Sequence, residues 1–341
     1  MNVLFIGGTG IISTACTALA AERGMALTVL RRGEHAVDLP PTVRTLTADI
    51  ADEAAVTAAL MDQHFDAVVD FVAYTPEHIE RDIRLFRGRT EQYVFISSAS
   101  AYQKPLSHYR ITESTPLANP YWQYSRDKIA CEERLLAAYR EDGFPITIVR
   151  PSLTYGDTQI PLAINSWLKP YTAIDRLRRG KKLIVPGDGT SLWVCTHNSD
   201  FAVGLIGLLG HAQAIGHAFH ITSDEVLTWD QITHLTAKAA GVEAQVIHIP
   251  ADFIGACIPE EACGLTGDKS ASVVFDNSKI KSYVPQYGAR VPFAEGIHRT
   301  IAWFDADPSR QIIDDDANRT WDKLITAYEA GLDAAIRQFR A

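Results

Sequence analysis

The chain has 341 residues, of which 47% are hydrophobic and 21% are charged, and its formal net charge is −9. This composition predicts a globular protein with a large buried core, and the negative charge argues against nucleic acid or an acidic membrane as a partner. No apolar run reaches the roughly eighteen residues of a membrane span, so we expect a cytoplasmic protein. The five cysteines lack the paired spacing of a zinc site, and we predict no bound metal.

The first segment predicts a dinucleotide-binding turn. An apolar run at 3–6 leads into the sequence GGTGIIS, which begins at Gly7, and a helical pattern follows over 15–23. Where a strand, a glycine turn and a helix follow one another, backbone N–H groups meet a pyrophosphate without a blocking side chain. Ser13 stands at the third glycine position, a small departure that the packing of helix on strand should tolerate.

The next predicted strand, 27–30, ends in Arg31 and Arg32. An acidic residue at this place would bind the adenosine ribose hydroxyls of NAD, whereas a guanidinium group suits the 2′-phosphate of NADP. We therefore expect NADP as the cofactor. The alternative is that Arg31 stacks on adenine while Arg32 is solvated, which would leave NAD acceptable.

Strands and helices alternate through the first half of the chain. Further strands are predicted at 43–46, 67–73, 93–96 and 146–150, and helices at 53–61 and 76–86. Such alternation predicts an α/β fold with a Rossmann-type, doubly wound parallel sheet, whose ligands bind at the carboxyl ends of its strands. Ser98 follows the strand at 93–96 and so belongs to that edge.

A tyrosine and a lysine stand one turn apart where another helical pattern begins. Tyr124 and Lys128 share a helix face and can point at one small site. A cation near a phenol favours the phenolate and lowers the phenol pKa, so Lys128 would make Tyr124 a usable general acid/base. Alone, this spacing is also common among ordinary solvated helix residues.

Taken in order, these motifs resemble the extended short-chain dehydrogenase/reductases. The resemblance is carried by GGTGIIS, Asp49-Ile50, ISSASAY with Ser98, YSRDK with Tyr124 and Lys128, and RPSLTYG from Arg150 to Gly156. Within that family the chain is most similar to an atypical NAD-dependent epimerase/dehydratase branch related to chloroplast stem-loop RNA-binding proteins. The sequences Arg31-Arg32-Gly33 and VVDFVAYTPEHI indicate that branch.

The resemblance implies a role for each motif. Tyr124 would exchange a proton with the substrate oxygen while a hydride passes to or from the nicotinamide, Lys128 would hold the nicotinamide ribose, and Ser98 would orient the substrate oxygen. The residues implied to line the cofactor are Gly7, Gly10, Ile11, Ile12, Asp49, Ile50, Phe71, Val72 and Ala73, together with Tyr124 and Lys128, and Pro151 and Leu153 near the nicotinamide.

The resemblance also implies two interleaved lobes. We assign residues 1–157, with a returning segment at about 193–221, to the NAD(P)-binding domain. Residues 158–192 and 222–341 are assigned to a smaller α/β substrate-binding lobe that ends in a C-terminal helix. A homodimer is an open alternative to a monomer, as in many members of the family.

Two departures from the family pattern concern the substrate site. The segment 74–90 lacks the asparagine that continues a proton relay in many relatives, and His78 stands nearest that place, either as a relay or as a solvated helix residue. The Gly267-Asp268 pair lacks the preceding arginine that grips a diphosphate in sugar-nucleotide epimerases. This second departure argues against a nucleotide-sugar grip at that position.

Two later patterns have alternative interpretations. The basic residues of 176–182 are Arg176, Arg178, Arg179, Lys181 and Lys182. They either meet an anionic substrate group or are a solvated helix end. The tail carries an apolar stripe at helical spacing, made of Trp321, Leu324, Ile325, Tyr328, Leu332, Ile336 and Phe339. This stripe packs on its own lobe or forms a subunit interface.

Three functional hypotheses follow. The first is an NAD(P)-dependent oxidoreductase of epimerase/dehydratase type that acts at a hydroxyl or keto carbon of a sugar or sugar-nucleotide-like small molecule. The second is an NADPH-dependent ketone or aldehyde reductase, which the arginine pair favours. The third is a non-catalytic cofactor-sensing or RNA-binding protein. The net charge of −9 argues against RNA, and the presence of Ser98, Tyr124 and Lys128 argues against lost catalysis.

Overall fold

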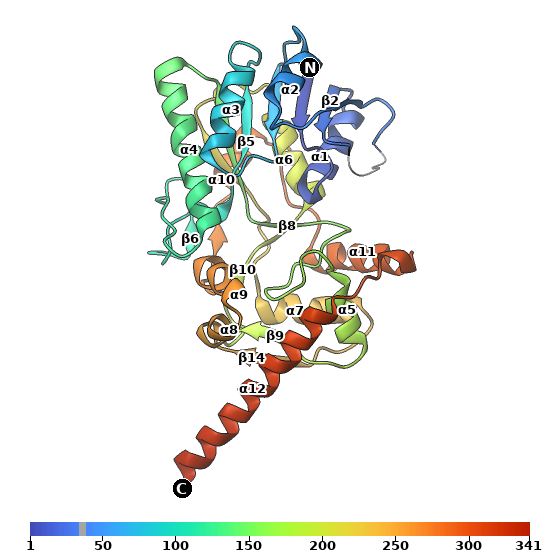
Figure 1. Ribbon diagram of the computed structural model, residues 1–341, viewed down its shortest axis with the longest axis vertical. Coiled ribbons are helices and arrows are strands. Elements are labelled where there is room, and N and C mark those ends of the chain that lie inside the picture. Colours follow the sequence, from blue (N-terminus) through green and yellow to red (C-terminus); the bar gives the residue numbers. More distant parts are fainter. Residues whose placement is uncertain (34–38) are drawn as a thin grey trace. The chain divides into compact units, whose positions relative to one another are not determined.

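The computed structural model describes residues 1–33 and 39–341 (Figure 1). The chain forms two compact units, each made of three segments. The first unit contains Met1–Thr154, Cys195–Asp224 and Phe275–Arg290, and the second contains Tyr155–Val194, Glu225–Val274 and Val291–Ala341.

The segment Phe275–Arg290 belongs to the first unit, although the sequence assignment placed it in the substrate lobe. Helix α10 (Ser278–Tyr283) in this segment buries Ile280 in the core of the first unit. Lys279 Nζ also donates a hydrogen bond of 2.8 Å to the carbonyl oxygen of Ala218. The residues of the Lys279 contact are 61 positions apart, so no local pattern indicated it.

A seven-stranded sheet forms the centre of the first unit, in the order β12-β7-β5-β4-β1-β2-β3. All of its strand pairs are parallel. Its strands are β1 (Asn2–Ile6), β2 (Ala26–Arg31), β3 (Arg44–Thr47), β4 (Ala67–Asp70), β5 (Tyr93–Ile96), β7 (Ile146–Pro151) and β12 (Ala218–Ile221). The expected Rossmann-type sheet is thereby confirmed. Because the strand order reverses between β1 and β4, the ligand crevice of this sheet is expected at their carboxyl ends.

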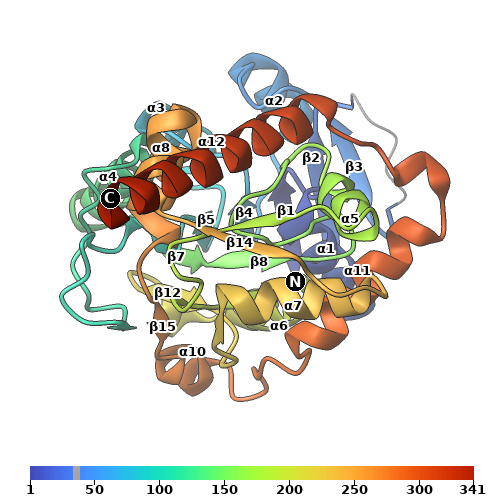
Figure 2. The same ribbon diagram turned by 90° about the horizontal axis from the view of Figure 1, so that it is seen from below.

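Different helices cover the two faces of this sheet. Successive strand residues point to opposite faces, so Phe5 joins one buried cluster and its neighbour Leu4 joins the other. The first face carries α1 (Ile11–Glu22), α6 (Asn198–Leu208) and α10, and the second carries α2 (Glu53–Leu60), α3 (Pro76–Phe86) and α4 (Gln123–Asp142). Figures 1 and 2 show α1 beside α6, and α3 beside α4.

The second unit is mostly helical around a parallel pair of strands, β9 (Leu183–Pro186) and β14 (Val246–Ile249). Its helices are α5 (Tyr171–Arg178), α7 (Trp229–Ala239), α8 (Ala251–Cys257), α9 (Pro259–Gly264), α11 (Phe293–Asp305) and α12 (Asp315–Arg340). Helix α7 begins with a capping box, in which Thr228 Oγ1 accepts the Gln231 N–H and Gln231 Oε1 accepts the Thr228 N–H. Among the described residues, no helix is both long and apolar enough to cross a membrane.

The remaining elements are short. The strands are β6 (Arg110–Ile111), β8 (Leu153–Tyr155), β10 (Leu192–Trp193), β11 (Cys195–His197), β13 (Leu227–Thr228) and β15 (Val274–Phe275). The single-turn helices are η1 (Ala99–Ala101), η2 (Ala212–Ala214) and η4 (Pro308–Arg310), and Leu265–Lys269 forms a π-helical turn, η3, after α9. The turn η1 directly follows Ser98, and it positions the end of β5 for the site described next.

Candidate active site

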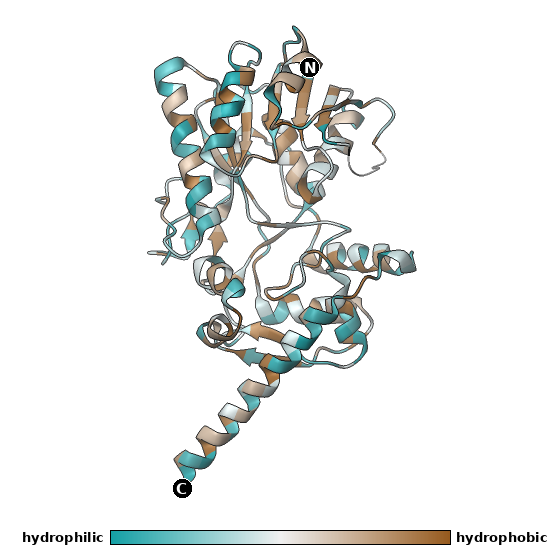
Figure 3. Cartoon of the chain, in the orientation of Figure 1, coloured by the Kyte–Doolittle hydropathy of each residue, from teal (hydrophilic) through white to brown (hydrophobic). Residues whose placement is uncertain are grey.

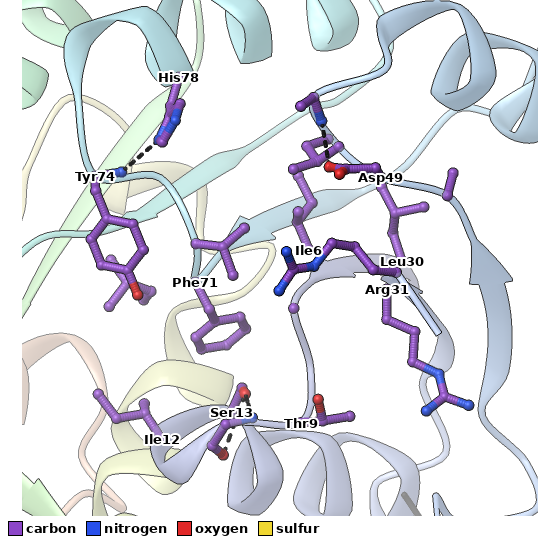
Figure 4. Close-up of a pocket in the computed structure, with 18 of the residues that line it drawn as sticks. Ile6, Thr9, Ile12, Ser13, Leu30, Arg31, Asp49, Phe71, Tyr74 and His78 are labelled. Carbon is purple, nitrogen blue, oxygen red and sulfur yellow. Dashed lines mark hydrogen bonds between the residues drawn. The ribbon is translucent and has the colours of Figure 1, made fainter. Parts of the chain in front are cut away.

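A cavity of about 770 Å³ opens in the first unit where β1, β2 and β4 end (Figure 4). Its size is that of a small-molecule or cofactor site. Ten of the residues expected at the cofactor line it: Gly7, Gly10, Ile11, Ile12, Arg31, Arg32, Asp49, Ile50, Phe71 and Val72. Its lining does not include five others: Ala73, Tyr124, Lys128, Pro151 and Leu153.

The glycine turn between β1 and α1 leaves room for a pyrophosphate. Gly7 has φ +80°, and a Cβ there would lie 2.5 Å from Val72 Cγ1, so only glycine fits. Gly10 is the N-cap of α1, and a Cβ there would meet only Ser13 Oγ, at 3.5 Å. Ser13 Oγ accepts the Gly10 N–H at 2.8 Å, which ties the turn to the helix. The cradle therefore fits the dinucleotide that the fold implies, with the N-terminus of α1 facing the cavity.

The part of the cavity beside the ends of β2 and β3 is lined by basic residues. Arg31 ends β2 and Arg32 follows it, and both side chains line the cavity together with Asp49. The Asp49 carboxylate accepts the Ala51 N–H at 2.9 Å and so shapes the loop after β3 (Figure 4). Two guanidinium groups at this end supply planar donor sets and positive charge for an anionic group of the cofactor.

Lys128 is buried beneath the carboxyl ends of two central strands. Its ammonium donates hydrogen bonds to the carbonyl oxygens of Ala73, at 2.7 Å, and Ile96, at 2.8 Å. Burial lowers the pKa of Lys128 to about 8. These carbonyl groups use two of the three N–H donors of the ammonium, so it links the end of β5 to the loop after β4.

Tyr124 lies on the first turn of α4, between two other aromatic rings. The Trp122 ring centroid is 5.0 Å from that of Tyr124, and the Tyr74 centroid is 6.4 Å away. Lys128 Nζ is 4.7 Å from the centroid of Tyr74 and 5.8 Å from that of Tyr124. Burial and the Asp70 carboxylate raise the pKa of Tyr74, so Tyr74 stays a neutral phenol. The lysine charge thus lies beside both phenol rings.

Ser98 belongs to a short chain of hydroxyl groups that the sequence motifs did not indicate. Ser125 Oγ donates to Ser100 Oγ at 2.8 Å, and Ser100 Oγ lies 2.9 Å from Ser98 Oγ. The Ser100 N–H also donates to Ser98 Oγ, at 3.2 Å. Either hydroxyl can donate in the contact between Ser98 and Ser100, because the Ser100 oxygen that accepts from Ser125 keeps a second lone pair.

A buried ion pair holds α4 against the sheet behind these residues. Glu132 lies one turn beyond Lys128, and its carboxylate accepts from Arg150 Nε at 2.9 Å and from Arg150 Nη2 at 2.6 Å. The same carboxylate accepts from Ser97 Oγ at 2.5 Å. Ser97 directly follows β5 and Arg150 lies near the end of β7, so this contact fixes the height of α4 relative to both strands.

Two further residues of the cavity lie on α3. His78 Nδ1 accepts the Tyr74 N–H at 3.1 Å, so the neutral ring carries its proton on Nε2 (Figure 4). Arg81 is buried beside Asp82, at 2.8 Å, and 3.6 Å from Asp70. Burial and the nearby Asp70 raise the pKa of Asp82. The sequence singled out His78 but not Arg81, because only the fold places this arginine against two carboxyl groups.

The basic cluster of 176–182 pairs with carboxylates of the second unit. Arg176 is buried and donates to Asn318 Oδ1 at 3.0 Å and Asp322 Oδ1 at 2.9 Å, both on α12. Arg178 binds both oxygens of Asp305. The other pairs are Arg179 with Asp175, Lys181 with Asp322, and Lys182 with Glu329. These contacts favour a structural role over contact with an anionic substrate.

Three known proteins illustrate what the chain is similar to. A 2′-dehydrokanamycin reductase of Streptomyces kanamyceticus is 27% identical over 295 residues, covering 85% of this chain and 81% of the reductase. The chloroplast stem-loop binding protein of 41 kDa b of Arabidopsis thaliana is 26% identical, covering 74% and 67%. The structure of UDP-glucose 4-epimerase from Bifidobacterium longum, in complex with NAD+ and UDP, has the same fold with a TM-score of 0.73 at 19% identity, covering 92% and 100%.

Residues 3–222 match the family model described as the NAD dependent epimerase/dehydratase family. This span includes the glycine turn, the arginine pair, and Ser98, Tyr124 and Lys128. Its relatives include sugar-nucleotide dehydratases, an epimerase and a sugar reductase, besides the chloroplast protein to whose branch the sequence is similar. The chain belongs to the NAD-dependent epimerase/dehydratase family.

Proposed function

We propose that the protein is an NAD(P)-dependent oxidoreductase that moves a hydride at a hydroxyl or keto carbon of a sugar or sugar derivative. Tyr124 is its general acid/base, as in the short-chain dehydrogenase/reductases. The observation that carries this proposal is the buried Lys128 ammonium, 5.8 Å from the Tyr124 ring centroid at the end of a sheet with a dinucleotide-sized cavity. Relatives named for reactions on sugar nucleotides and on 2′-dehydrokanamycin support the substrate class.

Each residue then has a task. The Gly10 turn and the N-terminus of α1 bind the pyrophosphate, and Arg31 and Arg32 bind the adenosine end. The bound nicotinamide supplies or accepts the hydride. In reduction, Ser98 donates a hydrogen bond to the substrate carbonyl and Tyr124 gives that oxygen its proton.

The positive charge of Lys128 stabilises the phenolate that Tyr124 becomes when it gives up its proton. In oxidation, the phenolate takes the proton of the substrate hydroxyl as the hydride leaves the carbon. Protons and hydride therefore balance in both directions, with Tyr124 regaining its proton from solvent after reduction.

A reductase that exchanges NADPH at each turnover is the second candidate. Two arginine side chains line the adenosine end of the cavity, and this observation favours NADPH over NADH. Denaturing the purified protein releases any bound nucleotide. The mass of that nucleotide distinguishes the two candidates. Tightly held NAD(H) supports the epimerase or dehydratase reaction, and an empty protein that prefers NADPH supports the reductase.

Tyr124→Phe tests the assignment of the general acid/base. Turnover of the substrate found by screening keto sugars and sugar nucleotides should fall about 10²- to 10⁴-fold, while the Kd for the nicotinamide cofactor stays within about twofold. Tyr121→Phe, on an exposed tyrosine three residues earlier, is the matched control and should keep full turnover. Undiminished turnover in Tyr124→Phe would refute the proposal.

A further inference from the structure

Helix α12 changes its surroundings along its length. Its first half buries Trp321, Leu324 and Ile325 in a core cluster of the second unit. The same apolar stripe continues into the second half, where Leu332, Ile336 and Phe339 are 49%, 38% and 92% exposed. Figure 3 shows the hydrophobic bands continuing along this end of the helix. The apolar stripe therefore extends along α12 beyond the part that is packed against other residues.

The exposed part has the spacing of a helix-pairing seam. Leu332, Ile336 and Phe339 are four and three residues apart, so they lie on one face, as in the core positions of a coiled coil. A helical end of a few turns is marginal in water without tertiary packing. This end is nevertheless helical to Arg340. A partner helix would supply the packing that the second unit provides only to the first half.

The order of charges along α12 favours a second copy of the chain as the partner, in an antiparallel orientation. The acidic residues Glu329 and Asp333 come first in this half of the helix, and the basic Arg337 and Arg340 come last. A second copy lying antiparallel sets the arginines of each chain beside the carboxylates of the other. A parallel copy would set like charges side by side, and it would also align the two helix dipoles unfavourably.

We propose that residues 328–340 form a homodimer contact in which two copies of α12 pack antiparallel. Leu332, Ile336 and Phe339 of each chain form the buried seam, and the terminal charges pair across it. Glu329, which already contacts Lys182 of its own chain, marks the end of the seam nearest the core of the second unit. The contact lies outside the cavity, so it forms without cofactor or substrate.

Sedimentation equilibrium of the full chain, from about 1 to 200 μM without ligand, tests the proposal. The natural sequence should sediment at twice the chain mass, and Ile336→Asp should raise the dimer Kd about 100-fold. Ala334→Asp is the matched control, because it adds the same charge two residues away, on the opposite side of the helix. That variant should remain a dimer.

Two results would overturn the contact. One is a natural sequence that stays monomeric to 200 μM, and the other is an equal effect of the two aspartates on the dimer. If Ile336→Asp instead lowers the thermal stability of a monomer, the stripe is covered by its own chain. Circular dichroism melts of both variants make this distinction.

A charge exchange tests the direction. Arg340→Glu and Asp333→Arg should each weaken the dimer several-fold, and the double variant should return to within about twofold of the natural Kd. If the two effects simply add, the helices are not antiparallel.

Discussion

Two sets of basic side chains on this molecule differ in what they face. Arg31, Arg32 and Lys128 lie at the carboxyl ends of the central strands, where the first two line the cavity and the third is held by carbonyl oxygens. The basic cluster of 176–182 instead faces carboxylates on α11 and α12. The sequence made Arg31 and Arg32, and also the basic cluster of 176–182, candidates for binding an anion. The position of a basic residue relative to the strand ends therefore separates the two sets better than the local number of charges does.

The partners explain this difference. A carboxylate neutralises an arginine, so little attraction for a substrate anion remains at Arg176 or Arg178. Carbonyl oxygens hold Lys128 without cancelling its charge, and that charge stays available to a phenolate. The comparison therefore predicts catalytic effects in the first unit and stability effects in the second.

The largest effect is expected from Lys128→Met. Removing the ammonium takes away the positive charge that would stabilise the proposed Tyr124 phenolate, and kcat should fall about 10³- to 10⁴-fold. Glu133→Gln, on an exposed residue of the same helix, is the control and should leave kcat within about twofold. Steady-state kinetics at pH 7 measure both variants, and a loss below tenfold would remove Lys128 from the proposed mechanism.

Arg176→Met is expected to act on stability alone. It leaves the Asn318 and Lys182 carbonyl groups without their donor, and the free energy of unfolding should fall by about 3 kcal/mol. Arg179 is itself exposed and pairs with Asp175, one helical turn earlier. Arg179→Met should therefore change the free energy of unfolding by less than about 0.5 kcal/mol. Urea unfolding measures both. A strong loss of substrate affinity in folded Arg176→Met would contradict the structural role of the cluster, because it would show that the cluster binds a ligand.

The pH dependence of stability comes next. Burial lowers the pKa of Lys128 from its ordinary value of 10.5 to about 8, so folding favours the neutral amine. Relative to Lys128→Met, the cofactor-free protein should gain up to about 3 kcal/mol as pH rises from 8 to 10.5, and the gain should be lost again as pH falls from 10.5 to 8. Urea titrations of both proteins at four pH values give the difference, and parallel stability curves would show that the pKa is unshifted.

The smallest effect is expected from a substitution of Arg32, which lines the cavity. If Arg32 binds the 2′-phosphate of NADPH, as proposed, Arg32→Ala removes that charge-assisted contact and the Kd for NADPH should rise about 10- to 100-fold. The Kd for NADH should stay within about twofold, which makes NADH the internal control. Calorimetric titration with each nucleotide checks this, and equal weakening of both would mean that Arg32 contacts a group common to the two cofactors.

Local patterns predicted the sheet and the glycine turn because both are encoded by neighbouring residues. Gly7 must adopt a positive φ directly after a buried strand, and the sequence shows both features side by side. Lys128 is different. Its carbonyl partners at Ala73 and Ile96 are 55 and 32 residues away, and only the sheet brings them together.

A sequence pattern also could not predict which carboxylates pair with the basic cluster of 176–182. Asp322 is 146 residues from Arg176, and nothing near either residue indicates the other. Ser98, Ser100 and Ser125 lie within the motifs that the sequence shows, but the hydrogen bonds between their hydroxyl groups depend on the folded geometry. Polar contacts between distant segments were thus the main part of the site that the sequence could not give.

The interleaving of the two units bears on how the chain is made. The chain passes from one unit to the other at each junction of its six segments, which is five times. Strand β7 cannot pair with β12 until residue 221 has been synthesised, and the first unit is whole only after 290 of the 341 residues. During synthesis, the nascent chain therefore exposes an unpaired sheet edge that invites aggregation. Neither unit could be exchanged between proteins as one continuous stretch of gene.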